Sequence, residues 1–237
     1  MEEELILEWL DENNIRLLIE IENSAVVRFS PSDMDSYGCQ VHRIDQNEER
    51  EVEIFYLEPL SQAKIAHELL HAKVDLVLGN GISLFDVPNI TETYQNFLRS
   101  ADQIVNACEH YIFFPDYLEM GHNVEESFEE YVLAEDVRDQ YDALCLRGLR
   151  AGLRYDVNRV FQFMALAFTF CLYPDNERFA DEKERLKRID RVLYNKVDRL
   201  REACDIDIIP ENREWLEDGY RQFSRSMNSW FRANGFR

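Results

Sequence analysis

Two histidines and a glutamate, in the run His67-Glu68-Leu69-Leu70-His71, have the residue types and spacing of a catalytic site. On a helix, residues four apart lie on one face, so His67 and His71 can direct both imidazoles at one ion. Glu68 stands beside them, where it can act on a water molecule rather than on the ion. This H-E-x-x-H spacing indicates a zinc site with Glu68 as general base. The alternative is a pair of core histidines that bond to nearby carbonyls.

The element that must hold this motif is a helix over residues 62–78. Ser61 has the side chain of an N-cap, residues 62–78 contain neither Gly nor Pro, and Gly79-Asn80-Gly81 ends the pattern. Six side chains give this helix a broad apolar surface: Ile65, Ala66, Leu69, Leu70, Val74 and Leu78. We therefore expect a buried helix and a dry site, in which interactions between charges are strengthened.

A catalytic zinc site needs a third protein ligand, which we expect on a second helix over residues 91–114, ended by Pro115. In this largely apolar segment, Asn106, Glu109 and His110 share roughly one side of the helix. Buried polar groups need partners, and a metal would supply one. Glu109 is the preferred third ligand, and His110 is the alternative ligand or a proton donor. Asn106 would orient a ligand as its hydrogen-bond partner.

The first 60 residues indicate a short helix followed by a small antiparallel sheet, with Glu22-Asn23-Ser24 as a hairpin turn. Four strands are predicted, at residues 15–21, 25–29, 40–44 and 52–57. Four helices are predicted after Gly121, at residues 123–145, 147–172, 177–204 and 211–232. The predicted fold is α+β, with a core at residues 1–121. An all-helical region at residues 122–237 packs on this core or continues the same domain.

The composition narrows the class of protein. With 26 Lys and Arg against 47 Asp and Glu, the formal net charge is −21, and such a surface repels phosphate backbones. Direct binding to nucleic acid is therefore not expected. The five cysteines contain no C-x-x-C pair, which indicates reduced thiols in a cytoplasmic protein. The longest apolar run, residues 160–173, is too short to span a bilayer, so no membrane segment is expected.

A second group of residues with possible chemistry is basic. Arg147, Arg150 and Arg154 follow i, i+3, i+7 spacing, which on a helix forms one basic stripe in an acidic protein. Gly148 and Gly152 lie one turn apart and would permit close helix packing. The stripe predicts either a site for a substrate carboxylate or salt bridges to surrounding acids.

The motif at residues 67–71, followed by a second helix that carries Glu109, resembles the gluzincin zinc metallopeptidases. The small sheet before it, without a large insertion, is similar to the minimal ImmA/IrrE-like members of that group. The resemblance is specific at the five motif residues and looser over residues 50–120, and it does not extend to residues 123–237. The segment at residues 106–110 departs from the Glu-Ala-Asn type of run in that family, so Glu109 and His110 both stay open as third ligand.

The resemblance implies a zinc-dependent endopeptidase that cuts a specific protein or peptide substrate, such as a regulator or repressor. Zinc would activate a water molecule, Glu68 would take its proton, and Tyr111, Tyr117 or His110 would donate to the oxyanion. An extended substrate would pair with the strand at residues 52–57. The alternative is a non-catalytic, acidic helical interaction protein with a structural or vestigial metal site, which a fourth ligand would favour.

Overall fold

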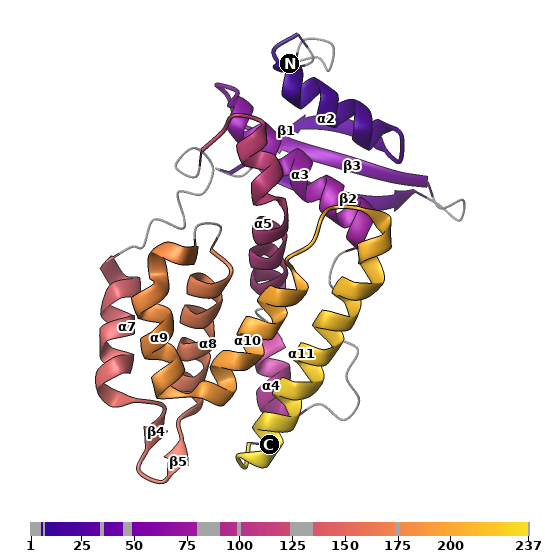
Figure 1. Ribbon diagram of the computed structural model, residues 1–237. Helices are drawn as coiled ribbons and strands as arrows, with labels where there is room; N and C mark the ends of the chain where they lie inside the picture. The colour runs from indigo at the N-terminus through magenta and orange to yellow at the C-terminus, as the bar shows by residue number, and fades with distance from the viewer. Residues whose placement is uncertain are drawn as a thin grey trace. The chain divides into compact units, whose positions relative to one another are not determined.

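The computed structural model in Figure 1 describes residues 6, 8–33, 36–44, 49–79, 91–98, 101–123, 135–173 and 176–236. The chain divides into two compact units. Unit 1 comprises Met1–Gly79, Phe113–Glu129 and Ile208–Pro210, and unit 2 comprises Asn80–Ile112, Glu130–Asp207 and Glu211–Arg237. The predicted α+β class is confirmed, because a small sheet precedes a mostly helical remainder. The domain boundary expected at residue 121 stays a prediction.

Unit 1 contains a three-stranded sheet made of β1 (Val26–Pro31), β2 (Gly38–Ile44) and β3 (Glu49–Tyr56). The strand order is β1-β3-β2, with β3 parallel to β1 and antiparallel to β2. The expectation of a purely antiparallel sheet is therefore wrong. The strand expected at residues 52–57 is the central one, and both of its edges are already paired. A substrate cannot add to it as a further strand, because strand addition needs an exposed sheet edge.

The helix α2 (Glu12–Glu22) replaces the strand that was expected at residues 15–21. Asp11 caps the helix, because its side chain accepts a hydrogen bond of 2.8 Å from the backbone N–H of Asn14. The buried residues of α2 recur with a helical period, at positions 14, 17, 18 and 21. They pack on α3, so tertiary burial decides the conformation of an apolar run that also fits a strand.

The helix α3 (Gln62–Leu78) carries the H-E-x-x-H motif and has the predicted bounds. Ser61 is its N-cap, with its hydroxyl accepting from the backbone N–H of Lys64 at 3.4 Å, and Gly79 ends it with a φ of 88°. Ten of the helix residues are buried, and α3 packs against α2, β2 and β3. The motif therefore lies on a core helix of unit 1, as the sequence predicts.

The segment expected as one helix over residues 91–114 contains two, α4 (Glu92–Leu98) and α5 (Ala101–Glu119). Pro115 lies inside α5 rather than ending it. A proline inside a helix removes one backbone hydrogen bond and costs about 3 kcal/mol or more. Burial of Phe113, Phe114 and Tyr117 around it favours continuation of the helix, because each aromatic side chain contributes roughly 1.5–3 kcal/mol when fully buried.

The other helices belong to the C-terminal part of the chain: α7 (Glu135–Arg147), α8 (Val157–Cys171), α9 (Ala180–Ile189), α10 (Arg191–Ala203) and α11 (Arg213–Ala233). Two short 3₁₀ helices also occur, η3 (Asn176–Phe179) and η4 (Pro210–Asn212). α7, α8 and α9 lie side by side (Figure 1). The helix that was expected at residues 177–204 is divided at Asp190, which is the N-cap of α10. Of the helix expected at 123–145, residues 124–134 lie outside the described ranges.

The helix expected at residues 147–172 is wrong in its first part. Gly148 and Gly152 adopt positive φ angles of 60° and 68°, a conformation that ends α7 and turns the chain. A two-stranded hairpin follows, β4 (Arg150–Ala151) with β5 (Arg154–Tyr155). This hairpin means that the C-terminal region is not all-helical. The three arginines therefore form no helical stripe, and Arg150 instead stacks on the Tyr155 ring at 4.6 Å.

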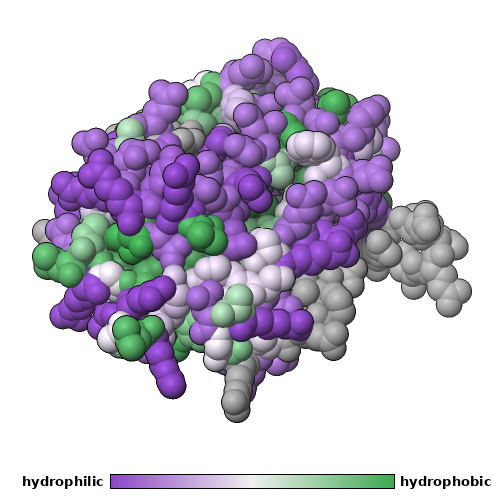
Figure 2. All heavy atoms as spheres, turned by 60° about the horizontal axis from the view of Figure 1, so that its bottom comes forward, coloured by the Kyte–Doolittle hydropathy of each residue, from purple (hydrophilic) through white to green (hydrophobic). Residues whose placement is uncertain are grey.

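The face of the molecule drawn in Figure 2 is largely hydrophilic. Figure 2 shows hydrophilic side chains over most of the face that it draws, with smaller hydrophobic groups between them. None of the helices within the described ranges is both long and apolar enough to cross a membrane. None of the five cysteines is in a disulfide within the described residues, and Cys108, Cys171 and Cys204 are buried.

Candidate metal centre

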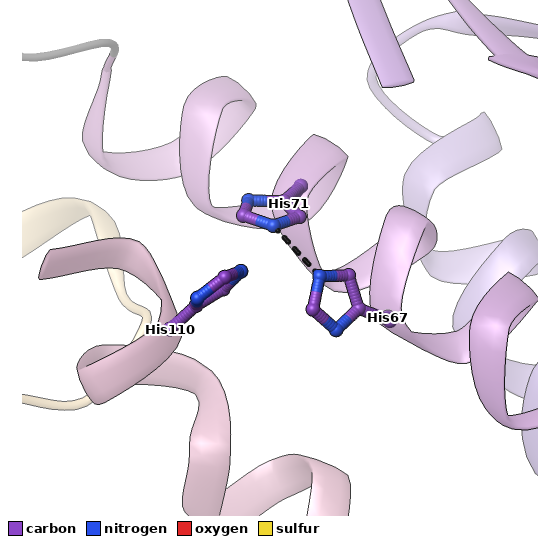
Figure 3. A group of neighbouring side chains, drawn as sticks. All are labelled: His67, His71 and His110. Carbon is purple, nitrogen blue, oxygen red and sulfur yellow. Dashed lines mark hydrogen bonds between the residues drawn. The ribbon is translucent and has the colours of Figure 1, made fainter. Parts of the chain in front are cut away.

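His67 and His71 lie on one face of α3 with their rings turned toward each other. Their Nε2 atoms are 3.1 Å apart (Figure 3). Zinc binds imidazole nitrogen at 2.0–2.1 Å, so two nitrogens of a tetrahedral site lie roughly 3.3–3.4 Å apart. The pair therefore has nearly the separation that a shared ion requires. The four-residue spacing on a buried helix fixes it.

A third imidazole, that of His110 on α5, points toward this pair (Figure 3). One ring nitrogen from each of the three histidines lies within 4.8 Å of the others. The boundary between the two units falls inside α5, just after Ile112. One turn beyond His110, Phe113 packs edge-on against the rings of His67 and His71, with centroid distances of 5.4 and 4.9 Å. Phe113 thus lies beside both histidines of α3.

The three histidines are shielded from water. His67 is 7% exposed and His110 is 1% exposed, whereas His71 is half-buried. Burial lowers the pKa of His67 well below its ordinary value, with a further lowering from the neighbouring His71. Burial also lowers the pKa of His71 to about 3. Both side chains are therefore neutral at physiological pH, which is the form that binds metal ions.

Of the two candidates for third ligand, the structure brings His110 to the pair. Glu109 is not part of the cluster, because adjacent residues on a helix point about 100° apart. Its carboxyl group instead interacts with Tyr220 of α11. Burial first, and then the Cys108 and Cys204 thiols and the Glu109 carboxylate, raise the pKa of Tyr220. Burial raises the pKa of Glu109 itself to about 8.

The other predicted site residues lie on α3 and α5. Glu68 is half-buried on α3 between the two histidines in sequence. The Tyr111 hydroxyl accepts a hydrogen bond of 3.3 Å from Arg201 of α10. Tyr117 is buried, and its ring centroid lies 6.4 Å from that of His67. Asn106 lies on α5 outside the cluster and lines a groove of unit 2.

Phe113 is a site residue that the sequence analysis missed. It contacts both α3 histidines and stands one turn after His110, so it fills the space beside the cluster. Its position in the apolar run of α5 gives a signal for burial only. Which face of α5 meets α3 depends on packing between segments far apart in the sequence.

The donor set fits a transition-metal ion. Neutral imidazole nitrogens suit zinc, copper, nickel and iron, and three of them leave a coordination position for water or substrate. Within the described ranges, no further His, Cys, Asp or Glu side chain joins the three histidines. The three histidines can therefore hold a metal ion.

Comparisons of this chain with known proteins found no relative. No protein-family model matches the sequence, and neither the curated proteins nor the solved structures yield a match. Inference about function consequently depends on the geometry of the three histidines and on the chemistry of the glutamate beside them.

Proposed function

We propose that this protein is a zinc-dependent endopeptidase, with His67, His71 and His110 as ligands and Glu68 as general base. The observation that carries the proposal is the convergence of three imidazoles from two helices, one helix of which also bears a glutamate at the H-E-x-x-H position. Zinc, when bound, polarises the scissile carbonyl and lowers the pKa of a bound water to about 7.

The protein's own residues supply the proton transfers. Glu68 takes a proton from the attacking water and returns it to the leaving amine. The amine then leaves as a neutral group, which lowers the barrier to cleavage of the peptide bond. Among the tyrosines named for the oxyanion, Tyr117 is the one whose ring packs beside that of His67.

His110 in place of a carboxylate changes the electrostatics of the ligand set. Three neutral imidazoles leave the full positive charge on the ion, whereas a Glu109 ligand would cancel part of it. The proposal thus keeps the peptidase chemistry that the gluzincin resemblance implies but assigns a different third ligand. We also propose a cytoplasmic location, in keeping with cysteines that form no disulfide among the described residues, and a narrow protein substrate such as a regulator.

The test uses the zinc-loaded full chain and a proteome-derived peptide library, with new N-termini read by mass spectrometry. The expected result is zinc-dependent cleavage by the wild type, its loss on chelation, and its loss in Glu68→Gln with the zinc content retained. Cleavage by Glu68→Gln at the wild-type rate would exclude Glu68 as the base. A zinc-loaded wild type that cuts no peptide in the library would contradict the peptidase assignment.

A further inference from the structure

A groove with a volume of about 480 Å³ lies on unit 2, along α4, α5 and α8. Its size falls within the range of roughly 300–1,000 Å³ that is typical of ligand sites. α5 also carries His110, so one helix contributes both to this groove and to the histidine cluster. None of the residues named in the proposed mechanism lines this groove.

Charged side chains are missing from the described part of the groove lining, although the protein as a whole is highly charged. Asp, Glu, Lys and Arg make up 31% of the sequence, yet none of the described residues that line the groove is one of these. A charged ligand group placed here would lose hydration without gaining a counter-charge, which is unfavourable. The lining therefore favours a neutral ligand.

Four carboxamide side chains provide the polar part of the lining: Asn96, Gln103, Asn106 and Gln162. The amides of the first three form no hydrogen bond within the described part of the chain. Gln162 donates through Nε2 to the carbonyl of Gln140 at 3.4 Å and keeps its amide oxygen as an acceptor. Each carboxamide offers two donors and an acceptor oxygen, which matches the N–H and C=O groups of a peptide.

Apolar side chains provide the rest of the lining. Phe97, Ile104 and Phe168 are buried, and Phe161 is half-buried with its ring 6.0 Å from that of Phe97. Ala165 is exposed on α8. An apolar lining with a few polar groups is the usual composition of a binding site.

Two of the carboxamide residues, Gln103 and Asn106, lie on α5, the helix that carries His110. Gln103, Asn106 and His110 follow i, i+3, i+7 spacing and so form one stripe of that helix. At 1.5 Å per residue, Asn106 and Gln103 stand roughly 6 and 10 Å before His110 along the axis. An extended peptide advances about 3.3 Å per residue, so these distances correspond to about two and three peptide residues.

We propose that this groove binds an uncharged segment of the peptide substrate, about two to three residues from the scissile bond, and selects against acidic and basic side chains there. This inference rests on the proposed function for the identity of the ligand as a peptide. The carboxamides bind the peptide amides, and the phenylalanine side chains of the lining contact an apolar or aromatic side chain. Asn96, Gln103, Asn106 and Gln162 are thereby specificity-determining residues.

The test measures binding rather than cleavage, on full-length zinc-loaded Glu68→Gln protein. The probes are acetyl-Gln-Phe-Gln-Ala-Leu-Ala-amide and two counterparts in which both Gln residues are Glu or Lys, titrated by nuclear magnetic resonance. We expect the Gln peptide to bind at least about tenfold more tightly than either charged peptide, because only it avoids an unpaired charge in the groove. Equal affinities for the three peptides, or no binding of the Gln peptide at millimolar concentration, would overturn the inference.

Two further variants locate the binding. Ala165→Trp fills the groove from an exposed position and should weaken binding of the Gln peptide about tenfold. Ala180→Trp, at an exposed position of α9 outside the groove, should leave the binding unchanged. Gln103→Lys should shift the preference toward the Glu peptide. Unchanged binding in Ala165→Trp would overturn the assignment of this groove.

The outcomes separate the inference from the proposed function. If the wild type cuts peptides but Ala165→Trp binds and cuts like the wild type, the groove assignment fails and the peptidase stands. If the Gln peptide binds in the groove but the wild type cuts nothing, the groove stands as a peptide site and the peptidase fails.

Discussion

The Nε2 atoms of His67 and His71 lie 3.1 Å apart on one face of α3. This separation follows from a four-residue spacing on a helix that is buried on several sides and capped at both ends. A metal ion would therefore meet two ligands whose relative position the fold already determines, and only the His110 nitrogen would have to approach. Preorganisation of this kind reduces the free energy lost in ordering ligands on binding.

The N-cap of α3 should contribute measurably to stability. Ser61→Ala removes the acceptor for the Lys64 N–H and should lower the free energy of unfolding by about 1 kcal/mol. Ser61→Asp keeps an acceptor at this position and should retain most of the stabilisation from the cap. Urea denaturation followed by circular dichroism measures both variants. Equal stability of Ser61→Ala and wild type would show that the cap contributes nothing.

The crossing of α10 and α11 should depend on a glycine. A Cβ atom at Gly219 would lie 2.4 Å from the Cβ of Ala203, closer than two carbons can approach. Replacing Gly by Ala inside a helix ordinarily raises the free energy of unfolding by about 1 kcal/mol. Here we expect Gly219→Ala to lower the free energy of unfolding by roughly 1–2 kcal/mol, because overpacking costs more than the gain in propensity.

A double mutant provides the control for this prediction. Ala203→Gly removes the opposing methyl group, so Gly219→Ala should be tolerated better in that background than in the wild type. Thermal melts of the wild type, the two single mutants and the double mutant measure the coupling between the two positions. A stabilising effect of Gly219→Ala in the wild-type background would show that α10 and α11 are not in such close contact.

The thiols should differ in reactivity with iodoacetamide at pH 8. Burial raises the pKa of Cys171 to about 11, although a hydrogen bond with Tyr194 opposes the rise, so little of it is thiolate. Cys108 and Cys204 are also buried, whereas Cys39 and Cys145 are half-buried. We expect Cys39 and Cys145 to react first, and the other three only on unfolding. Mass spectrometry of the modified peptides measures the order, and rapid alkylation of Cys171 in the folded protein would contradict it.

The parts of the fold that were predictable from sequence are those with local signals. The bounds of α3 follow from Ser61, Gly79 and the absence of Gly and Pro between them. The hairpin at Arg150 also has a local signal in its glycines. The one-turn spacing of Gly148 and Gly152 fits packing positions of a helix, but both adopt the positive φ that Gly tolerates best.

The parts that were not predictable depend on distant contacts. The run at residues 15–21 fits both a strand and a helix, and packing on α3 selects the helix. The choice between Glu109 and His110 is of the same kind. The two are neighbours on α5, and only the rotation of that helix about its axis decides which one faces His67. Local sequence does not encode that rotation.

Zinc content per chain shows whether three histidines hold one zinc ion. Tag-free wild type, His110→Ala, Glu109→Gln and His42→Ala, a control at an exposed histidine of β2, should be compared by native mass spectrometry after incubation with zinc. We predict about one zinc in the wild type, in Glu109→Gln and in His42→Ala, and little in His110→Ala, because two imidazoles alone hold the ion weakly. Loss of zinc from Glu109→Gln with full retention in His110→Ala would contradict the account.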